Sequence, residues 1–403
     1  MKTTKPKLRR GGAGRILTTH VGSLIRPPAL LTFLAAQRDK RPYDEPAFKT
    51  CLHDAVGEVV RRQADTGLDI INDGEFGKTI SWSRYVLERM SGFEQRPVAS
   101  DNGMPAAVLG RDRREFAEFY AAYDRTQGFS QMSGWAVTGP IRYTGQAAIQ
   151  RDLENFKAAM KGVKATDFFM PAVAPTSVAP DRLDEYYKSD EDYVFAVAEA
   201  LREEYKAIVD AGFILQVDDA YLALSYEVLV PPGTMKDYRR WAAIRIEALN
   251  HALQGLPEER TRYHVCWGSW NGPHAYDVEL KRIVDLILRV RTGGYLLEMA
   301  NPRHEHEWRV WEQVKLPQGK VLIPGVISHA TNVVEHPELV AERLVRLARV
   351  VGRNNIMAGT DCGFAQGPFV QRVHPTIMWA KLRSLVDGAR LASKRLWGHR
   401  ATG

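Results

Sequence analysis

Strand-like runs alternate with helical patterns along almost the entire chain, and this alternation restricts the possible folds more than any other feature of the sequence. Nine runs are rich in apolar and β-branched residues, and they span residues 16–20, 69–72, 135–138, 168–173, 214–217, 263–266, 295–298, 321–327 and 356–360. Strands that alternate with helices are typical of parallel sheets. We therefore predict an α/β protein with a (β/α)8 TIM barrel. Because such a barrel has eight strands, one of the nine runs is expected outside it, either residues 168–173 or the N-terminal run.

Two of the predicted helices are marked clearly by their ends. Ser189 and Asp190 can cap a helix that runs to about Asp210, and Gly212 lies just beyond its end. A second helix is predicted over residues 337–351. Apolar residues recur at spacings of three and four in both, so each helix should pack one face against the sheet.

Residues 92–134 interrupt the alternation with a long polar stretch that contains several aromatic residues. Long excursions of this kind in compact domains are usually lids, binding loops or oligomer contacts. We expect a cap or insertion over the barrel mouth, with a contact in a homo-oligomer as the alternative. The rest of the chain is predicted to be a basic flexible tail over residues 1–15 and a single barrel domain over residues 16–403.

Charge and cysteine content argue against several other classes of protein. The net charge is +7, but after the first fifteen residues Lys and Arg are interleaved with Asp and Glu, which does not suggest a nucleic-acid-binding surface. No apolar segment approaches the length of a membrane span, and none follows the basic N-terminus as in a secretory signal. Three cysteines in 403 residues fit a reducing compartment. We therefore expect a cytoplasmic protein without a nucleic-acid or membrane partner.

Polar and charged residues follow several of the predicted strands at the point where each strand ends. They are His20, Ser23, Arg26, Glu75, Asp218 and His329. Because the carboxyl ends of parallel strands meet at one face of a barrel, we expect these side chains to line a polar pocket. Glu75 and Asp218 could hold an ammonium group or a proton. Arg26 could hold a carboxylate, sulfonate or phosphate, and His329 could donate a proton to a leaving group.

Two of the three cysteines end strand-like runs and form part of a possible metal site. His264 and Cys266 are two residues apart in one run, so their side chains should point to the same face. Glu298 ends the next run, and Cys362 follows the last one. Imidazole, thiolate and carboxylate ligands suit Zn²⁺. For the first pair taken alone, the alternative is that the His and the Cys are ordinary core residues. Cys51 lies in a helical pattern and is interpreted as an ordinary thiol.

With these residues in view, the chain resembles the cobalamin-independent methionine synthase family, specifically its C-terminal catalytic barrel. The resemblance is closest to the epoxyalkane:coenzyme M transferase branch, and it extends over nearly the whole chain after the basic tail. It implies that zinc is held by His264, Cys266, Glu298 and Cys362, the last of which lies in an Asp-Cys-Gly turn. It also implies a pocket for a thiol substrate at Gly22, Ser23, Glu75 and Asp218.

Other segments are similar to the coenzyme M branch rather than to methionine synthases. They are residues 138–145, 264–274 and 302–308. In methionine synthases the first of these segments carries a Trp that helps to hold folate, and here Tyr143 and Thr144 occupy that neighbourhood. The resemblance therefore does not imply that methyl-folate is the alkyl donor for this chain.

The resemblance implies an enzyme, a zinc-dependent transferase that activates a thiol as the zinc thiolate for S-alkylation. The expected reaction is methyl transfer to homocysteine or a related thiol, so the partners are a small-molecule thiol and an alkyl donor. The alternative is an epoxyalkane:coenzyme M transferase that opens an epoxide with a sulfonated thiol. A more remote alternative is an enzyme like uroporphyrinogen decarboxylase, which uses the same barrel without a metal.

Overall fold

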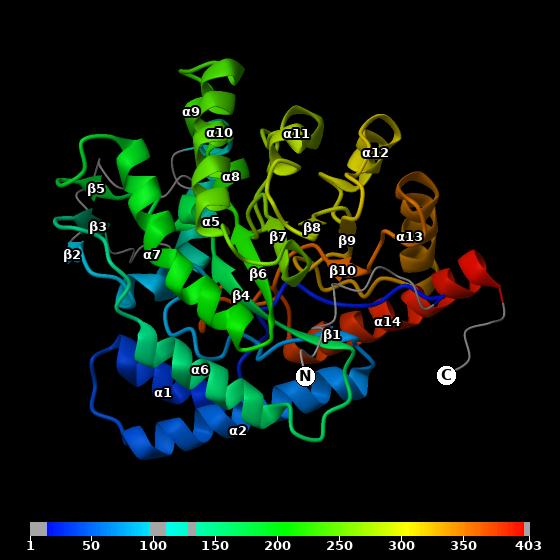
Figure 1. The fold of residues 1–403 in the computed structure, drawn as a ribbon, viewed down its shortest axis with the longest axis horizontal. Helices are drawn as coiled ribbons and strands as arrows, with labels where there is room; N and C mark the ends of the chain where they lie inside the picture. The colour runs from blue at the N-terminus through cyan, green and yellow to red at the C-terminus, as the bar shows by residue number, and fades with distance from the viewer. Residues whose placement is uncertain (1–13, 97–109, 128–133, 399–403) are drawn as a thin grey trace.

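The computed structural model describes residues 14–96, 110–127 and 134–398, and they form an α/β barrel (Figure 1). Within these residues, a parallel sheet contains seven strands in the spatial order β1-β4-β6-β7-β8-β9-β10. The strands are β1 (Ile70–Ile71), β4 (Asp167–Val173), β6 (Ile214–Asp219), β7 (Thr261–Val265), β8 (Gly294–Leu297), β9 (Val321–Ile327) and β10 (Gly359–Thr360). Spatial order follows chain order, as it does when each strand returns through an outer helix.

The N-terminal run closes this sheet into a barrel. Thr18 forms a parallel bridge with Ala358, just before β10, and the amide of Thr19 donates to the carbonyl of Ala358 at 2.9 Å. On its other side, the amide of Ile70 in β1 donates to the carbonyl of Thr18 at 3.0 Å. The run therefore takes the eighth strand position, and the predicted (β/α)8 barrel is confirmed.

The strand that lies outside the barrel is not one of the two that the sequence suggested. Residues 168–173 belong to β4, which pairs with β1 and β6, and the N-terminal run closes the barrel. Residues 135–138 instead overlap β3 (Gly134–Val137), which pairs with β2 (Phe93–Arg96) and β5 (Leu183–Asp184) in a separate small sheet. Both strands begin with two partly exposed residues, but β4 continues with five buried residues that pair with β6, whereas β3 continues with only two.

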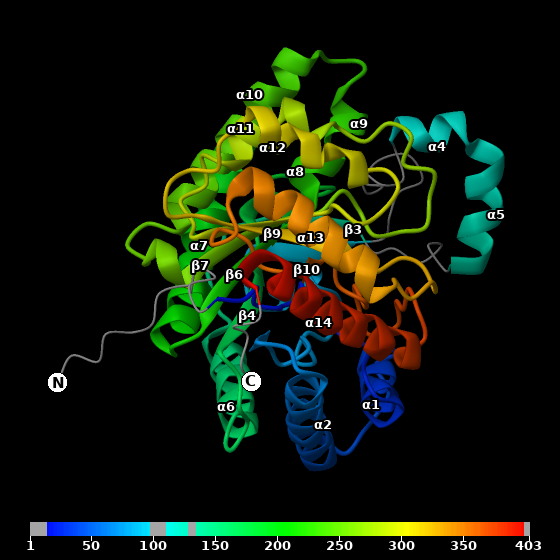
Figure 2. The same cartoon turned by 90° about the vertical axis from the view of Figure 1, so that its right-hand side faces the viewer.

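The helices surround the barrel sheet in both views (Figures 1 and 2). They are α1 (Pro28–Arg38), α2 (Glu45–Thr66), α6 (Gln146–Ala159), α7 (Asp190–Asp210), α8 (Tyr221–Leu224), α9 (Tyr226–Leu229), α10 (Met235–Ala252), α11 (Val284–Ile287), α12 (Val310–Gln313), α13 (Pro337–Val351) and α14 (Pro375–Trp397). Short 3-10 turns are η1 (Arg84–Glu88), η2 (Pro175–Ser177), η3 (Glu258–Arg260), η4 (Leu280–Arg282) and η5 (Glu305–Arg309). Within the described residues, no helix combines the length and the apolar character needed to cross a membrane.

Both helices that the sequence marked by their ends are confirmed. The Ser189 side chain accepts a hydrogen bond from the amide of Asp192 at 3.0 Å and caps α7, which ends at Asp210. Helix α13 covers residues 337–351 and ends at Gly352, whose φ of 92° suits glycine. In each helix the side chains at the predicted apolar positions are largely buried against the sheet or neighbouring helices.

The interior of the barrel holds a buried arginine among apolar side chains. Arg262 in β7 donates to the hydroxyl of Thr19 at 3.0 Å and to the carbonyl of His20 at 3.2 Å. Its guanidinium also lies 3.9 Å from the ring centroid of Phe169. Arg262 therefore ties the N-terminal strand to the opposite side of the barrel and satisfies backbone groups there.

The described parts of the 92–134 segment contact the loop that follows β7. They include α4 (Arg111–Glu115) and α5 (Ala117–Gln127) (Figure 2). Asp112 accepts a hydrogen bond from the amide of His274 at 3.0 Å, and the hydroxyl of Tyr120 accepts one from the indole of Trp270 at 2.9 Å. Residues 97–109 and 128–133 of this segment, and residues 1–13 of the predicted tail, lie outside the described residues. The roles predicted for the segment and for the tail stay predictions.

Candidate active site

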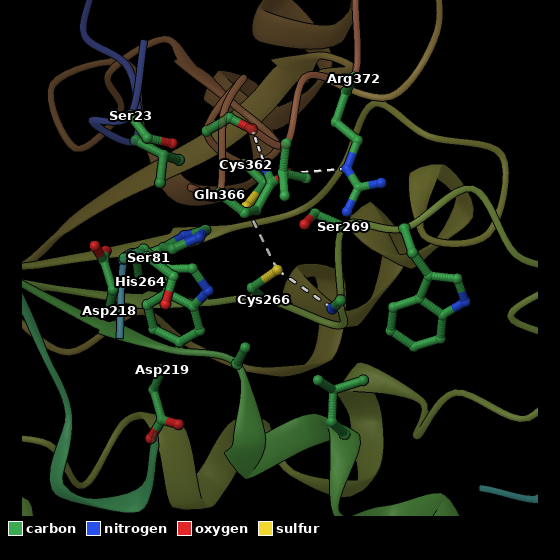
Figure 3. Close-up of a pocket in the computed structure, with 18 of the residues that line it drawn as sticks. Ser23, Ser81, Asp218, Asp219, His264, Cys266, Ser269, Cys362, Gln366 and Arg372 are labelled. Atoms are coloured by element: carbon green, nitrogen blue, oxygen red, sulfur yellow. Dashed lines mark hydrogen bonds between the residues drawn. The ribbon is translucent and has the colours of Figure 1, made fainter. Parts of the chain in front are cut away.

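A cavity of about 240 Å³ lies at the carboxyl ends of the barrel strands, where the active sites of such barrels are built (Figure 3). Its polar lining includes six residues from strand ends or the loops after them: Ser23, Glu75, Asp218, His264, Cys266 and Cys362. Aromatic side chains from Trp82, Tyr221 and Trp270 form another part of the wall. Segments that are far apart in the chain thus converge as the strand-end pattern predicts.

His264, Cys266 and Cys362 form a compact group of potential metal ligands in this cavity. One ligand atom from each of the three lies within 4.8 Å of the others, and all three residues are buried. The two sulfurs are 3.5 Å apart. His264 lies in β7 and Cys266 follows it by two residues, so the strand geometry turns both side chains to one face.

The two cysteines share a proton unequally. The hydrogen bond between them lowers the pKa of Cys362 well below its ordinary value and raises the pKa of Cys266 well above its own. Burial alone would lower the pKa of His264, but the neighbouring Cys362 sulfur and the Asp218 carboxylate raise it instead. The site therefore favours negative charge on sulfur next to an imidazole, which is the electrostatic environment of a metal-binding thiolate.

Glu298 lies outside this three-residue group. It follows β8, and its carboxylate accepts hydrogen bonds from the amide of Trp267 at 2.9 Å, the side chain of Asn301 at 2.7 Å and Arg303 at 2.8 Å. Burial alone would raise the pKa of Glu298, but Arg303, His304 and other cations lower it. The carboxylate is therefore ionised, as a metal ligand requires, while its oxygens are engaged by the protein.

Ser23, Glu75 and Asp218 also line the cavity. Glu75 forms an ion pair with Lys78 at 3.1 Å, and both side chains are buried. Asp218 accepts a hydrogen bond from Gln216 at 2.6 Å, and burial raises its pKa to about 7. Two carboxylates therefore border the cavity, and one of them is already compensated by a lysine.

Two glycines allow the chain to approach these residues closely. A Cβ at Gly363 would lie 1.9 Å from the hydroxyl oxygen of Ser23, and a Cβ at Gly22 would lie 2.7 Å from a carboxylate oxygen of Glu75. Gly22 also has a φ of 140°, which L side chains rarely adopt. Gly22 is not itself part of the cavity lining. Its lack of a side chain leaves room for the Glu75 carboxylate beside it.

The other predicted substrate residues lie behind the cavity wall. Arg26 donates to the carbonyls of Glu75 at 2.6 Å and Lys78 at 2.9 Å, so its guanidinium holds the loop that carries Glu75. His20 is hydrogen-bonded to Gln63 at 2.7 Å, and burial lowers its pKa to about 4. Neither residue belongs to the lining, and this geometry does not support a direct contact of either with a substrate.

His329, the predicted proton donor, is fully buried just after β9. Neither of its ring nitrogens has a hydrogen-bond partner among the described residues. Burial lowers its pKa, and the charges that act on it include those of Cys362 and Glu298. His329 is therefore a buried imidazole close to the cysteine site, although it does not line the cavity, and the negative charges of Cys362 and Glu298 favour its protonated form while burial opposes it.

Some cavity residues were missed by sequence reasoning. Arg372 and Gln366 reach the cavity from the loop after Cys362, and Trp82 reaches it from the loop before η1. No spacing pattern or strand end marks these three positions. Trp270 also lies in the wall, and the only signal for it was its place in residues 264–274, a segment that the family resemblance singled out.

Known proteins show similarity to almost the whole chain. A 2-hydroxypropyl-CoM lyase from Xanthobacter autotrophicus is 25% identical over 384 residues, which cover 89% of this chain and 89% of the relative. A methionine synthase from Sulfolobus acidocaldarius is 24% identical over 383 residues, with 94% and 93% covered. Among solved structures, a B12-independent methionine synthase from a Shewanella species, in complex with selenomethionine, has a TM-score of 0.69 at 21% identity. That match covers 95% of this chain and 99% of the other, and it shows the shared fold.

The family assignment comes from a match to a family model. The model for the catalytic domain of cobalamin-independent synthase matches residues 180–390, which is more than half of the 403 residues. The matched region contains His264, Cys266, Glu298 and Cys362, and it begins after Ser23 and Glu75. The chain belongs to the cobalamin-independent methionine synthase family.

Proposed function

We propose that this protein is a zinc-dependent thiol alkyltransferase that binds a small thiol and transfers an alkyl group to its sulfur. The observation that carries the proposal is the convergence of His264, Cys266 and Cys362 from two distant strand ends into one buried group. Membership of the family supports a transferase. The similarity to the 2-hydroxypropyl-CoM lyase and to the methionine synthase extends over nearly their full lengths, which supports a shared type of reaction.

The donor atoms present fit zinc. One nitrogen and two sulfurs form a set that borderline-soft Zn²⁺ prefers over hard oxygen-binding cations such as Mg²⁺. Neither ring nitrogen of His264 has a hydrogen-bond partner among the described residues, although the imidazole is buried. A buried polar atom without a partner is costly, and coordination of a metal would satisfy it. Glu298 remains the candidate for a fourth ligand.

Bound zinc would keep a coordinated substrate thiol deprotonated at neutral pH, where a free thiol with a pKa near 8.5 is only about 3% ionised. The protein side chains then have separate tasks. Ser23, Glu75 and Asp218 hold the polar part of the thiol, and the aromatic wall excludes water from the sulfur.

The transfer forms a carbon–sulfur bond and breaks the bond between the transferred carbon and its leaving atom. The leaving atom takes the electron pair of the broken bond and needs a proton. His329 is the candidate donor because its buried imidazole interacts with the charge of Cys362, which favours the protonated ring, and neither ring nitrogen has a hydrogen-bond partner among the described residues. The proton would be replaced from solvent between turnovers.

Methyl transfer to homocysteine or a related thiol is the reaction that we propose first. Epoxide opening by a sulfonated thiol is the second candidate, and the similarity to a 2-hydroxypropyl-CoM lyase favours it. In that reaction the carbon–oxygen bond of the epoxide breaks, and the alkoxide takes the proton. The converged cysteines argue against the metal-free decarboxylase alternative.

Metal analysis and a thiol-consumption assay test the proposal together. The purified protein should contain about one zinc per chain. It should consume thiol with one of three donor classes, methyl-folate, simple methyl donors or epoxides, each tried with homocysteine and coenzyme M. Cys266→Ser and Cys362→Ser should lose zinc and activity while they stay folded. Cys51→Ser is the matched control, because Cys51 lies in α2 away from the site, and it should keep both.

Full zinc occupancy in either site variant would contradict the ligand assignment. A metal-free wild-type protein that stays inactive after zinc is added would contradict the proposed function as a whole.

A further inference from the structure

Arg372 is a cation on the wall of the active-site cavity that sequence reasoning did not identify. It lies opposite Asp218 across the two cysteines in Figure 3, and its guanidinium is directed into the cavity. The side chain is anchored, because its Nε donates to Gln366 at 2.8 Å and Gln366 in turn donates to the carbonyl of Gly363 at 2.6 Å. The position of Arg372 is thus tied to the turn that carries Cys362.

The charge of Arg372 is not balanced by a carboxylate. Among the residues that the structure describes, no Asp or Glu forms an ion pair with it, and its neighbours are the Tyr123 phenol and the sulfurs of Cys266 and Cys362. Burial lowers the pKa of Arg372, but the group remains a cation at neutral pH. By contrast, Arg303 in the loop after β8 pairs with two carboxylates.

A partly buried arginine with no carboxylate partner among the described residues is costly to the folded protein. An anionic ligand would offset that cost. The planar guanidinium presents paired N–H donors that match the oxygens of a carboxylate or sulfonate.

The carboxylates of Glu75 and Asp218, which also line the cavity, are already engaged by other protein groups and so attract a ligand cation less strongly than two free carboxylates would. Lys78 compensates Glu75 at 3.1 Å, and its ammonium also lies 4.6 Å from the ring centroid of Tyr85. Asp218 is likewise engaged by the protein, because its carboxylate accepts a hydrogen bond from the side chain of Gln216 at 2.6 Å. The cavity as a whole is therefore arranged to receive an acidic group on the Arg372 side.

We propose that Arg372 binds an acidic group of the acceptor thiol and selects anionic thiols over neutral thiols of the same size. This inference rests on the proposed function, because it assumes that the thiol sulfur binds beside Cys266 and Cys362. The ligand class is a short thiol with a carboxylate or sulfonate. An amino group is not required for this contact.

The test compares pairs of thiols in which the acidic group of one is replaced by a neutral polar group in the other. The zinc-loaded protein is titrated by calorimetry at pH 7.5 with 3-mercaptopropionate and its neutral amide, and with 2-mercaptoethanesulfonate and 2-mercaptoethanol. Wild-type protein should bind each acid roughly 10-fold to 100-fold more tightly than its neutral partner, as expected for a charge-assisted contact. Comparison of the affinities for 3-mercaptopropionate and 2-mercaptoethanesulfonate shows whether the site binds a carboxylate or a sulfonate more tightly.

Arg372→Gln should reduce this preference to less than about threefold while the affinity for the neutral thiols changes little. Arg372→Lys, which keeps the charge but loses the paired donors, should retain an intermediate preference. Arg349→Gln on the exposed face of α13 is the matched control and should behave as wild type. Zinc content and the thermal midpoint are measured for every variant, and the wild-type comparison stands even if Arg372→Gln does not fold.

The outcomes separate the two proposals. If wild-type protein binds acids and neutral thiols equally, or if Arg372→Gln keeps the full preference, the role of Arg372 is overturned and the proposed function stands. If the zinc-loaded wild type binds none of the four thiols and consumes no thiol with any donor, the proposed function fails and this inference fails with it.

Discussion

His304 should make the stability of the protein depend on pH in a way that one substitution removes. The imidazole is 2% exposed and bonds to two carboxylates, Glu307 at 2.8 Å and Asp277 at 3.1 Å. Its ring also packs against Trp267, with 4.6 Å between centroids. Burial by itself would lower the pKa of His304, but the hydrogen bonds to the two carboxylates raise it to about 9.

The sign and size of the effect follow from this pKa. The unfolded chain has the ordinary histidine value of about 6.5, so the folded state binds the proton more tightly. The stabilisation is therefore fully present below pH about 6.5 and is lost as the pH rises through about 9. The difference between about 9 and about 6.5, at about 1.36 kcal/mol per pH unit, corresponds to about 3 kcal/mol of unfolding free energy.

The assay is urea unfolding followed by tryptophan fluorescence at several values between pH 6 and pH 10. Wild-type protein should lose about 3 kcal/mol more than His304→Gln over this range, since glutamine cannot take up the proton. His306→Gln is the matched control because His306 is exposed in the same turn, η5, and it should follow the wild type. Other buried groups such as Asp218 titrate in all three proteins, so they cancel in the comparison. Parallel stability curves for wild type and His304→Gln would refute the argument.

Three further predictions concern the active site. Glu75→Gln and Asp218→Asn should each weaken thiol binding by about 1–3 kcal/mol in calorimetric titrations while zinc content stays the same, and an unchanged affinity in both would remove them from the pocket. His329→Asn should lower kcat roughly 10²-fold to 10⁴-fold without loss of zinc, whereas a less stable variant that keeps more than about half its turnover would show a purely structural role. Gly363→Ala should raise KM for the thiol, because a Cβ 1.9 Å from the Ser23 hydroxyl must displace it; an unchanged KM with normal zinc content would contradict this.

Local signals in the sequence were sufficient for much of the fold. The cap at Ser189 and the spacing of apolar residues in α7 depend on neighbours within one or two helical turns, and the structure reproduces both. The convergence of His264 and Cys266 follows from the period of a strand together with the rule that strand ends of a barrel share one face. Cys362 follows from the same rule.

Strand partners could not be predicted in the same way. The runs at 135–138 and 168–173 are both mainly apolar, yet one joins the small outer sheet and the other becomes a barrel strand. Which of them enters the barrel depends on hydrogen bonds to strands far away in the chain, such as the pairing of β4 with β6. Those contacts leave no local pattern in the sequence.

The sequence by itself determined the barrel, its main helices and the His264, Cys266 and Cys362 group that could hold a metal ion, because periodicity, capping and strand direction act over short distances. Only the tertiary structure decided what each charged side chain faces. Arg26 is close to Ser23 in the chain, but its guanidinium turns behind the wall to two backbone carbonyls. Arg372 has no sequence signal and reaches the cavity through the fold of the loop after Cys362. Side-chain direction is set by the packing and hydrogen bonds of distant segments, and these exist only once the chain has folded.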